Sequence, residues 1–322
     1  MFPKRWLILL LSGLLAVSNA VGKEPTPAEQ IRPTGVHTPA DKADSESDSP
    51  IPKKSTKKKW TNRAAKSDED ASLGTLPNGV PVTKARSIMV INAQTGQILY
   101  EKNPDEFRAA ASTQKLLTAL IVSERGYLDQ PVTVQQVDTL AEPVKLNIKP
   151  GDTYQRIDLL RALLVKSPND VARCLARDYA GSVEAFAEIM NRRAQQLGAV
   201  HSHFVNPNGL PDPRQYSTAR DLSLIARAAY ANPTIRSIVC MPQYVFRFAN
   251  GRTRELENTN KVLRRLPYCN GMKTGYTELA GHCLISSAAR PGRDVIAVVL
   301  GDSKAGIWRD SAALLAWALW QG

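Results

Sequence analysis

Segments with the apolar pattern of β-strands occur at both ends of the patterned part of this chain. The first, SIMVINAQTGQILYEKN at residues 87–103, predicts two strands joined by a turn at Gln94-Thr95-Gly96. The later strands are predicted at YVFRF (244–248), CNGMKTGY (269–276), CLISSAA (283–289) and DVIAVVLGD (294–302). A central antiparallel β-sheet built from both ends, with helices on both faces, is the simplest architecture that joins them. The order of the segments therefore predicts an α+β fold.

The segments between these strands have apolar residues three or four positions apart, which indicates helices. Helices are expected within residues 111–126, 158–167, 168–181, 183–198 and 217–233, and a final one at 308–320. The first is apolar nearly all round, which is typical of a helix buried in a core. Gly198 is expected to end the fourth helix, and Ser217 or Thr218 to cap the fifth. Together they predict a helical subdomain beside the sheet.

The first 83 residues have a different composition. MFPKRWLILLLSGLLAVSNA, residues 1–20, has a basic start, an apolar middle and small residues at its end, which predicts a signal peptide cleaved after Ala20. An uncleaved anchor is the alternative, but the apolar run is short for a membrane span. Residues 21–83 are polar and proline-rich, and we expect a disordered linker before a catalytic domain at 84–322. The protein is thus predicted to be exported, periplasmic or cell-wall associated, and soluble after cleavage.

The net charge of +12 and the pI of about 9.6 favour anionic partners. The run from Lys53 to Lys66 contains seven basic residues and no acidic one, which suggests electrostatic contact with an anionic envelope. A solvated tail without a partner is the alternative. Nucleic acid is not expected, because Trp60 is the only aromatic residue in this basic run.

The chain has four cysteines, which allow three pairings in an oxidising compartment: Cys174, Cys240, Cys269 and Cys283. Cys269 and Cys283 lie on neighbouring strands of a predicted hairpin, so a disulfide between them is one hypothesis. There is no C-x-x-C pattern, and His201-Ser202-His203 has no nearby third ligand. Neither a metal nor another cofactor is expected.

Three short motifs could carry chemistry. Ser112 and Lys115 form S-x-x-K at the start of the buried helix, where the two side chains would share one face. A lysine amine can take the proton of a serine if burial or a neighbouring cation lowers its pKa. A helix start followed by a surface lysine is the alternative.

The second motif, Ser167-Pro168-Asn169, has the form S-x-N and lies between two helices, where a hydroxyl and a carboxamide could relay a proton and hold an amide. The third is Lys273-Thr274-Gly275, or K-T-G, on a predicted strand. Its lysine would lower the pKa of Lys115 and attract a carboxylate, and its glycine would let a substrate lie against the strand. An ordinary loop and an ordinary hairpin turn are the respective alternatives.

All three motifs in this order resemble the low-molecular-mass penicillin-binding proteins, the D-alanyl-D-alanine carboxypeptidase and endopeptidase family. The resemblance extends to NPNGL at 206–210, STARDL at 217–222, NTN at 258–260 and KTGYTELAGHCLISSAAR at 273–290. It covers about residues 85–320. It implies a β-lactamase/transpeptidase-like fold and a serine-type peptidase that acts on peptidoglycan stem peptides without a cofactor. It also implies that β-lactams acylate the enzyme as covalent inhibitors.

The resemblance assigns a role to each motif residue. Ser112 would be the acylated nucleophile, Lys115 its base, and Ser167 with Asn169 the second catalytic motif. The substrate-binding residues would be Lys273, Thr274, Gly275, Tyr276 and Arg309, the last at a position that helps to bind the terminal carboxylate in some members. The backbone N–H groups of Ser112 and Tyr276 would form the oxyanion hole. Pro168 departs from the family, where a small residue is common.

Three features bear on alternative functions. EPVKLN at 142–147 resembles the deacylating glutamate segment of class A β-lactamases, but it precedes the S-x-N motif instead of following it. A non-catalytic wall-binding module would be favoured by loss of Ser112 or Lys115, and both are present. Within the peptidase family, D,D-carboxypeptidase activity is the first expectation and D,D-endopeptidase activity on cross-links the alternative, because the motifs do not encode the shape of the pocket.

Overall fold

The computed structural model describes residues 73–321, and the expected signal peptide and most of the expected linker lie outside this range. A five-stranded antiparallel sheet in the order β2-β1-β9-β8-β7 forms its centre. Its strands are β1 (Ser87–Asn92), β2 (Ile98–Lys102), β7 (Cys269–Thr277), β8 (Gly281–Arg290) and β9 (Arg293–Asp302). Strands from the two ends of the chain meet where β1 pairs with β9, as predicted. Within the described residues, no helix is long and apolar enough to cross a membrane.

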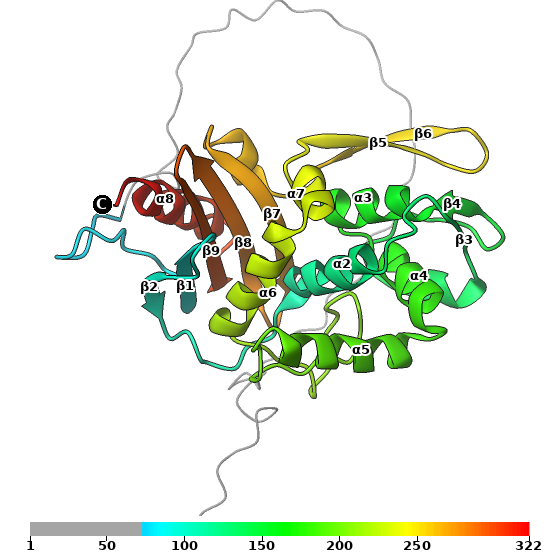
Figure 1. The fold of residues 1–322 in the computed structure, drawn as a ribbon, viewed down its shortest axis with the longest axis horizontal. Coiled ribbons are helices and arrows are strands. Elements are labelled where there is room, and N and C mark those ends of the chain that lie inside the picture. Colours follow the sequence, from blue (N-terminus) through cyan, green and yellow to red (C-terminus); the bar gives the residue numbers. More distant parts are fainter. Residues whose placement is uncertain (1–72, 322) are drawn as a thin grey trace, which may run out of the picture.

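Helices cover both faces of this sheet (Figure 1). They are α2 (Lys115–Glu124), α3 (Arg156–Lys166), α4 (Asn169–Ala180), α5 (Val183–Gln196), α6 (Ala219–Ala231), α7 (Pro233–Val239) and α8 (Gly306–Trp320). Among the described residues, the 3-10 turns are η2 (Ala111–Gln114), η3 (Gln136–Thr139) and η4 (Lys261–Arg264). The side chain of Thr218 accepts from the N–H of Asp221 and caps α6, so Thr218 rather than Ser217 is the N-cap. The α+β fold with helices on both faces is confirmed.

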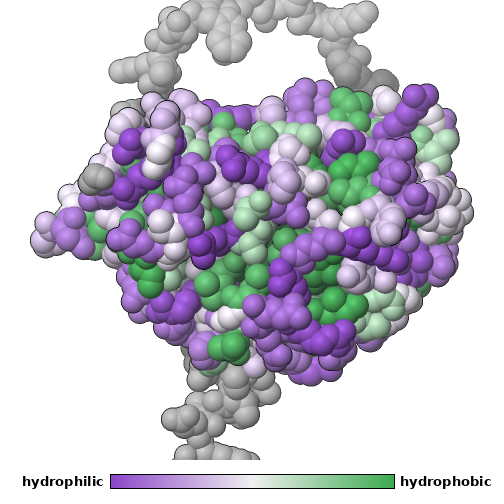
Figure 2. Space-filling view, in the orientation of Figure 1, coloured by the Kyte–Doolittle hydropathy of each residue, from purple (hydrophilic) through white to green (hydrophobic). Residues whose placement is uncertain are grey.

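The two faces of the sheet pack against different partners because alternate strand residues point to opposite sides. Val90 and Val299 pack with Leu314 and other residues of α8 in one cluster. Met89 and Val298 belong to the larger cluster, which also contains most of the buried apolar residues of α2 to α7. The molecular face shown in Figure 2 is largely hydrophilic, with separate apolar patches near its middle. Most apolar side chains are therefore used in the two clusters.

Two expectations about strands need correction. The segment YVFRF does not join the main sheet: it forms β5 (Gln243–Arg247), which pairs only with β6 (Thr253–Glu257) in a separate hairpin. Another small sheet, β3 (Pro131–Thr133) with β4 (Thr153–Gln155), was not predicted because its strands have three residues each. The predicted boundary between linker and catalytic domain also needs correction. Val80 from the expected linker is buried beside the sheet, so the packed segment begins before Lys84.

The hypothesis of a disulfide between Cys269 and Cys283 is wrong. In the β7–β8 hairpin Cys269 lies opposite Ala288, whereas Cys283 lies opposite Gly275. Five residues of β8 separate the two positions, which is on the order of 16 Å and far beyond the reach of a disulfide. All four cysteines carry free thiols, and only that of Cys240 is exposed.

Candidate active site

The nucleophile candidate lies on a strained turn. Ser112 belongs to η2, directly before α2, and the preceding Ala111 has a φ of +48°. Gly209 holds this turn in place, because a β-carbon at Gly209 would lie 2.0 Å from the carbonyl oxygen of Ala111. The hydroxyl of Ser112 lines the main cavity and contacts the carbonyl oxygen of Asn208 at 3.3 Å. A non-glycine residue at positive φ costs free energy, and such strain often occurs at functional sites.

Lys115 is a fully buried lysine, so the alternative of a surface lysine is wrong. Its Nζ lies 3.0 Å from Ser112 Oγ and 3.2 Å from Ser167 Oγ. Shorter contacts reach the carbonyl oxygen of Ser167 at 2.8 Å and Asn169 Oδ1 at 2.7 Å. These last two oxygens can only accept hydrogen bonds. A neutral amine that donates its two protons to them would turn its lone pair towards the two serine hydroxyls.

Two physical causes favour this neutral form. Burial lowers the pKa of Lys115 well below its ordinary value of 10.5, and the positive charge of Lys273 lowers it further. The carboxylate of Asp170 acts in the opposite direction, and its smaller effect does not cancel the other two. The side chain of Asp170 also accepts from the backbone N–H groups of Leu146 and Asn147. The site therefore lowers the pKa of a lysine next to a serine, as nucleophilic catalysis requires.

The second motif forms the junction between α3 and α4. Ser167 ends α3 with a φ of +68°, and Asn169 begins α4. The side-chain nitrogen of Asn169 contacts the carbonyl oxygen of Glu142 at 3.4 Å, which turns its Oδ1 towards Lys115. Pro168 has its ordinary φ of −66° just before α4. The proline therefore fits this junction without distortion.

The third motif lies on β7, the edge strand beside η2. Lys273 is fully buried and its Nζ donates to the carbonyl oxygen of Thr274 at 3.0 Å. Burial lowers the pKa of Lys273 to about 7. Thr274 donates to the hydroxyl of Thr259 at 2.7 Å and lines the cavity.

Gly275 brings β7 close to the nucleophile. A β-carbon at this position would lie 3.0 Å from the backbone nitrogens of both Ser112 and Thr113. The glycine was expected to make room for a substrate, and the structure shows that it makes room for the turn that carries Ser112. The next residue, Tyr276, is 57% exposed, and its ring stacks on that of His282 with centroids 4.4 Å apart.

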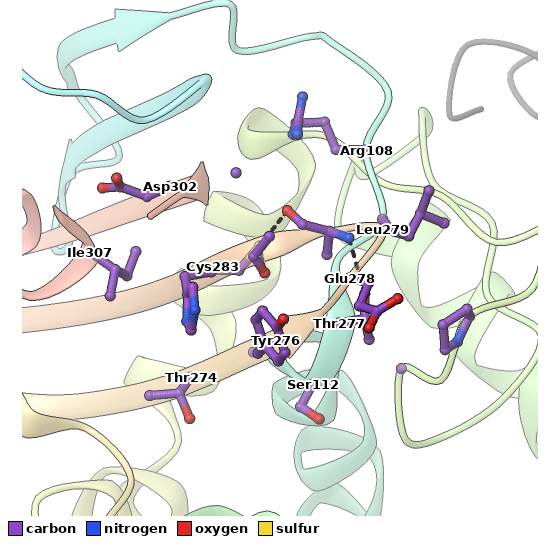
Figure 3. A pocket seen from close by; sticks show the side chains of 18 of the residues that line it. Arg108, Ser112, Thr274, Tyr276, Thr277, Glu278, Leu279, Cys283, Asp302 and Ile307 are labelled. Carbon is purple, nitrogen blue, oxygen red and sulfur yellow. Dashed lines mark hydrogen bonds between the residues drawn. The ribbon is translucent and has the colours of Figure 1, made fainter. Parts of the chain in front are cut away.

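These residues surround one cavity of about 1330 Å³. Ser112, Ser167, Asn169, Thr274, Gly275 and Tyr276 all line it. In Figure 3, Ser112, Thr274 and Tyr276 border the same space beneath the end of the β7–β8 hairpin. The structure thus brings together the members of all three motifs, with Lys115 and Lys273 buried in the wall behind them.

Arg309 is the one predicted site residue that the structure places elsewhere. It does not line the cavity, and its Nε donates to Asp310 Oδ1 at 2.8 Å within α8. Its neighbours Ile307 and Trp308 face the cavity instead. Arg309 lies in α8, and its guanidinium is ion-paired with the buried carboxylate of Asp310.

The sequence alone assigns no role to the loop at 206–210, although its NPNGL contributes to the family resemblance. Its Asn208 carbonyl contacts Ser112, and its Gly209 packs on Ala111. Arg108 was also missed. It lines the cavity four residues before the nucleophile, where no short motif marked it.

The deacylating role that a class A β-lactamase would give to Glu142 finds no support in the geometry. The carboxylate of Glu142 forms an ion pair with Lys145 at 2.5 Å, and its side chain is 73% exposed. It does not line the cavity that contains Ser112.

Comparison with known proteins agrees with the site. The peptidase S11 family, D-alanyl-D-alanine carboxypeptidase, matches residues 76–304. The D-alanyl-D-alanine carboxypeptidase DacB2 of Mycobacterium tuberculosis is 36% identical over 250 residues, 76% of this chain and 84% of that protein. The D-alanyl-D-alanine endopeptidase of Escherichia coli is 32% identical over 224 residues, 68% of this chain and 72% of that protein.

Solved structures show the same relationship. The crystal structure of D-alanyl-D-alanine carboxypeptidase from Mycobacterium tuberculosis H37Rv matches with a TM-score of 0.71 and 33% identity, over 76% of this chain and 94% of that chain. The Streptomyces K15 DD-transpeptidase matches with a TM-score of 0.70 and 30% identity, over 74% of this chain and 98% of that chain. The chain belongs to the peptidase S11 family of D-alanyl-D-alanine carboxypeptidases, which are serine peptidases. The expected family, enzyme class and transpeptidase-like fold are confirmed.

Proposed function

We propose that this enzyme removes the terminal D-alanine from peptidoglycan stem peptides through an acyl-Ser112 intermediate. One observation carries the proposal: a fully buried Lys115 Nζ lies within 3.2 Å of both Ser112 Oγ and Ser167 Oγ. One serine can be deprotonated by this amine, and the other can return the proton to a leaving group.

The first half of the reaction forms the acyl-enzyme. Neutral Lys115 takes the proton of Ser112, whose oxygen bonds to the carbonyl carbon before the terminal D-alanine. The N–H groups of Ser112 and Tyr276 stabilise the oxyanion. The proton passes from Lys115 through Ser167 to the departing nitrogen as the C–N bond breaks. Lys273 and Thr274 hold the carboxylate of the leaving D-alanine.

The second half returns the enzyme to its starting state. A water molecule attacks the acyl carbon, gives its proton to Lys115, and displaces Ser112, which is reprotonated. A β-lactam would acylate the same serine because it presents a strained amide and a carboxylate in similar places. Such an acyl-enzyme would be long-lived, since Glu142 is not placed to activate water.

This substrate implies a site of action outside the cytoplasm, which agrees with the signal peptide predicted at residues 1–20. The basic run from Lys53 to Lys66 would then face the anionic envelope. Both segments lie outside the described residues. Export is tested by the N-terminal sequence of the secreted protein, which should begin after Ala20.

The catalytic proposal is tested by labelling the protein with a fluorescent penicillin on a denaturing gel. We expect label on the wild type and none on Ser112→Ala, whose far-ultraviolet circular dichroism should be unchanged. Release of D-alanine from a pentapeptide should follow the same pattern. A folded wild type that neither takes label nor releases D-alanine would overturn the proposal and favour a wall-binding relative.

Endopeptidase activity is the second candidate, because a cavity of about 1330 Å³ around Ser112 could admit a branched leaving group. Digestion of cross-linked and uncross-linked muropeptides separates the two activities. Carboxypeptidase activity predicts faster loss of D-alanine from the uncross-linked pentapeptide than cleavage of the cross-linked dimer.

A further inference from the structure

The peptide group between Ala111 and Ser112 lies against two glycines from different parts of the chain. A β-carbon at Gly209 would be 2.9 Å from the backbone nitrogen of Ser112, and one at Gly275 would be 3.0 Å from the same nitrogen. Because a peptide group is planar, the position of the Ala111 carbonyl oxygen also sets the direction of the Ser112 N–H. The two close approaches therefore restrict the direction in which this N–H can point.

The two glycines are supported in different ways. Gly275 belongs to β7 and lies opposite Cys283 in the pairing of β7 with β8. Gly209 belongs to a described segment that forms neither helix nor strand, residues 205–210, which we call the Gly209 loop. Ala111, at a φ of +48°, keeps its strained backbone only if its surroundings hold it. The Gly209 loop must therefore be held in place by bonds other than those of a sheet.

Gln215 connects the two ends of this loop. Its side chain is buried, and its Oε1 accepts from the N–H groups of Val205 at 3.1 Å and Asn206 at 3.3 Å. Its Nε2 donates to the carbonyl oxygen of Leu210 at 3.0 Å. Its Oε1 also accepts from the side chain of Gln114 in η2 at 3.2 Å. One amide side chain thus joins both ends of the Gly209 loop to the turn that carries the nucleophile.

Further bonds fix the loop between its ends. Asn206 Oδ1 accepts from the N–H of Gly209 at 2.8 Å, within the loop itself. The side chain of Gln114 donates to the carbonyl oxygen of Asn206 at 2.6 Å. The hydroxyl of Thr118 in α2 donates to the carbonyl oxygen of Pro207 at 2.7 Å. The loop is therefore bonded directly to η2 and α2, on either side of Lys115.

We propose that Gln215 is a positioning residue for acylation: it holds the Gly209 loop against the Ala111–Ser112 peptide and so keeps the Ser112 N–H directed at the oxyanion. Gln215 does not line the cavity, so it acts through the loop and not on the substrate. The inference rests on the proposed function, which assigns this N–H to the oxyanion hole. A donor of this kind stabilises the transition state more than the bound substrate.

The test compares Gln215→Met with Asn191→Leu, a matched control on the same stretch of chain. The amide of Asn191 in α5 also makes a bond in each direction. Its Nδ2 donates to the carbonyl oxygen of Phe204 at 2.9 Å, and its Oδ1 accepts from the N–H of Phe204 at 2.7 Å. These bonds end one residue before the Gly209 loop. Both substitutions remove hydrogen bonds from buried backbone groups and should lower the melting temperature.

The kinetic measurement separates binding from chemistry. Stopped-flow traces at several concentrations of a fluorescent penicillin give the rate constant of acylation and the dissociation constant of the noncovalent complex. We expect Gln215→Met to lower the rate constant roughly 10²-fold, as for a misplaced oxyanion donor, and to change the dissociation constant little. Asn191→Leu should acylate close to the wild-type rate despite its lower melting temperature.

A second pair of variants tests the same loop if Gln215→Met does not fold. Thr118→Val keeps the volume of the side chain and removes the bond to Pro207, whereas Thr118→Ser keeps the hydroxyl. We expect acylation to be roughly fivefold slower in Thr118→Val, as for the loss of one hydrogen bond. Thr118→Ser should acylate close to the wild-type rate.

Amide hydrogen exchange gives a readout that does not depend on activity. Mass spectrometry of the segment 109–116 should show roughly tenfold faster exchange in Gln215→Met than in the wild type, and no such change in Asn191→Leu. Unchanged acylation by a folded Gln215→Met protein would overturn the proposal, as would an equal loss in Asn191→Leu. If the wild type took no penicillin, the proposed function would fail, and hydrogen exchange would still decide whether Gln215 holds the turn.

Discussion

Lys115 and Lys273 are both fully buried lysines, and burial lowers the pKa of each, but their surroundings differ. Four oxygen atoms lie within 3.2 Å of Lys115 Nζ. Lys273 Nζ has a single hydrogen bond among the described residues, to the carbonyl oxygen of Thr274. One amine is therefore enclosed by the protein's own acceptors, whereas the other retains donors without a protein acceptor.

This difference indicates that the two lysines have different functions. The acceptors around Lys115 fix the direction of its lone pair, which suits a base that moves a proton over a short distance. The unused donors of Lys273 suit a cation that is completed by a ligand carboxylate, and its charge helps to keep Lys115 neutral. The protonation state of Lys115 thus depends on Lys273, and substitution of the two lysines should have different effects.

The largest effect is expected for Lys115→Met, which keeps the length of the side chain and removes the base. The rate of acylation by penicillin should fall by roughly 10³-fold or more, because general-base assistance is lost. The melting temperature should rise, since the folded protein no longer has to bury an amine. Labelling kinetics and thermal denaturation on the same samples measure both changes.

Lys149→Met is the control for this experiment, at an exposed lysine outside the cavity. It should change neither the acylation rate nor the melting temperature appreciably. Acylation of a folded Lys115→Met protein within about tenfold of the wild-type rate would show that another group acts as the base.

The second prediction concerns pH. As pH rises, loss of the proton of Lys115 should increase kcat/KM, and loss of the charge that binds the carboxylate should decrease it from about pH 7, the pKa to which burial lowers Lys273. The two ammonium groups repel each other, so both limbs belong to the pair. Lys273→Arg should remove the falling limb, because arginine stays charged. Above the pKa of Lys273, the ratio of kcat/KM for the variant to kcat/KM for the wild type should rise about tenfold per pH unit.

A peptide with a C-terminal carboxamide provides an independent check, since it has no carboxylate for Lys273 and should lack the falling limb in the wild type. An unchanged falling limb in both experiments would assign this limb to another group.

The lowered pKa of Lys273 also affects the stability of the protein. Between pH 7 and the ordinary value of 10.5, the unfolded chain holds a proton that folded Lys273 lacks, so this residue's contribution to the free energy of unfolding increases with pH.

Much of this architecture could be predicted because local patterns determine it. Apolar strand segments at both ends of the chain imply the shared sheet, and three motifs at suitable positions anticipated the group around Ser112. The segment YVFRF shows the limit of this reasoning. A short apolar run predicts a strand but does not specify its partner, and here β5 pairs only with β6.

Other features depend on contacts between distant residues, which no local pattern contains. The register of β7 against β8 separates Cys269 from Cys283, and the carboxylate of Asp310 binds Arg309, which does not line the cavity. The importance of Gly209 becomes visible only when Ala111 lies against it. The residues that support the site were thus harder to predict than those expected to perform the chemistry.

The smallest expected effect concerns Thr259, which connects the regions of the two lysines. Its N–H donates to the carbonyl oxygen of Val165 in α3, and its hydroxyl accepts from Thr274 next to Lys273. Thr259→Val should leave the Thr274 hydroxyl without its partner and raise KM roughly fivefold, with a smaller change in kcat, because loss of one hydrogen bond costs about 1 kcal/mol. Thr259→Ser, which keeps the acceptor, should restore the wild-type KM. If Thr259→Val lowered kcat instead and left KM unchanged, Thr259 would act on the Lys115 side of this connection, and the assignment of Thr274 to carboxylate binding would need revision.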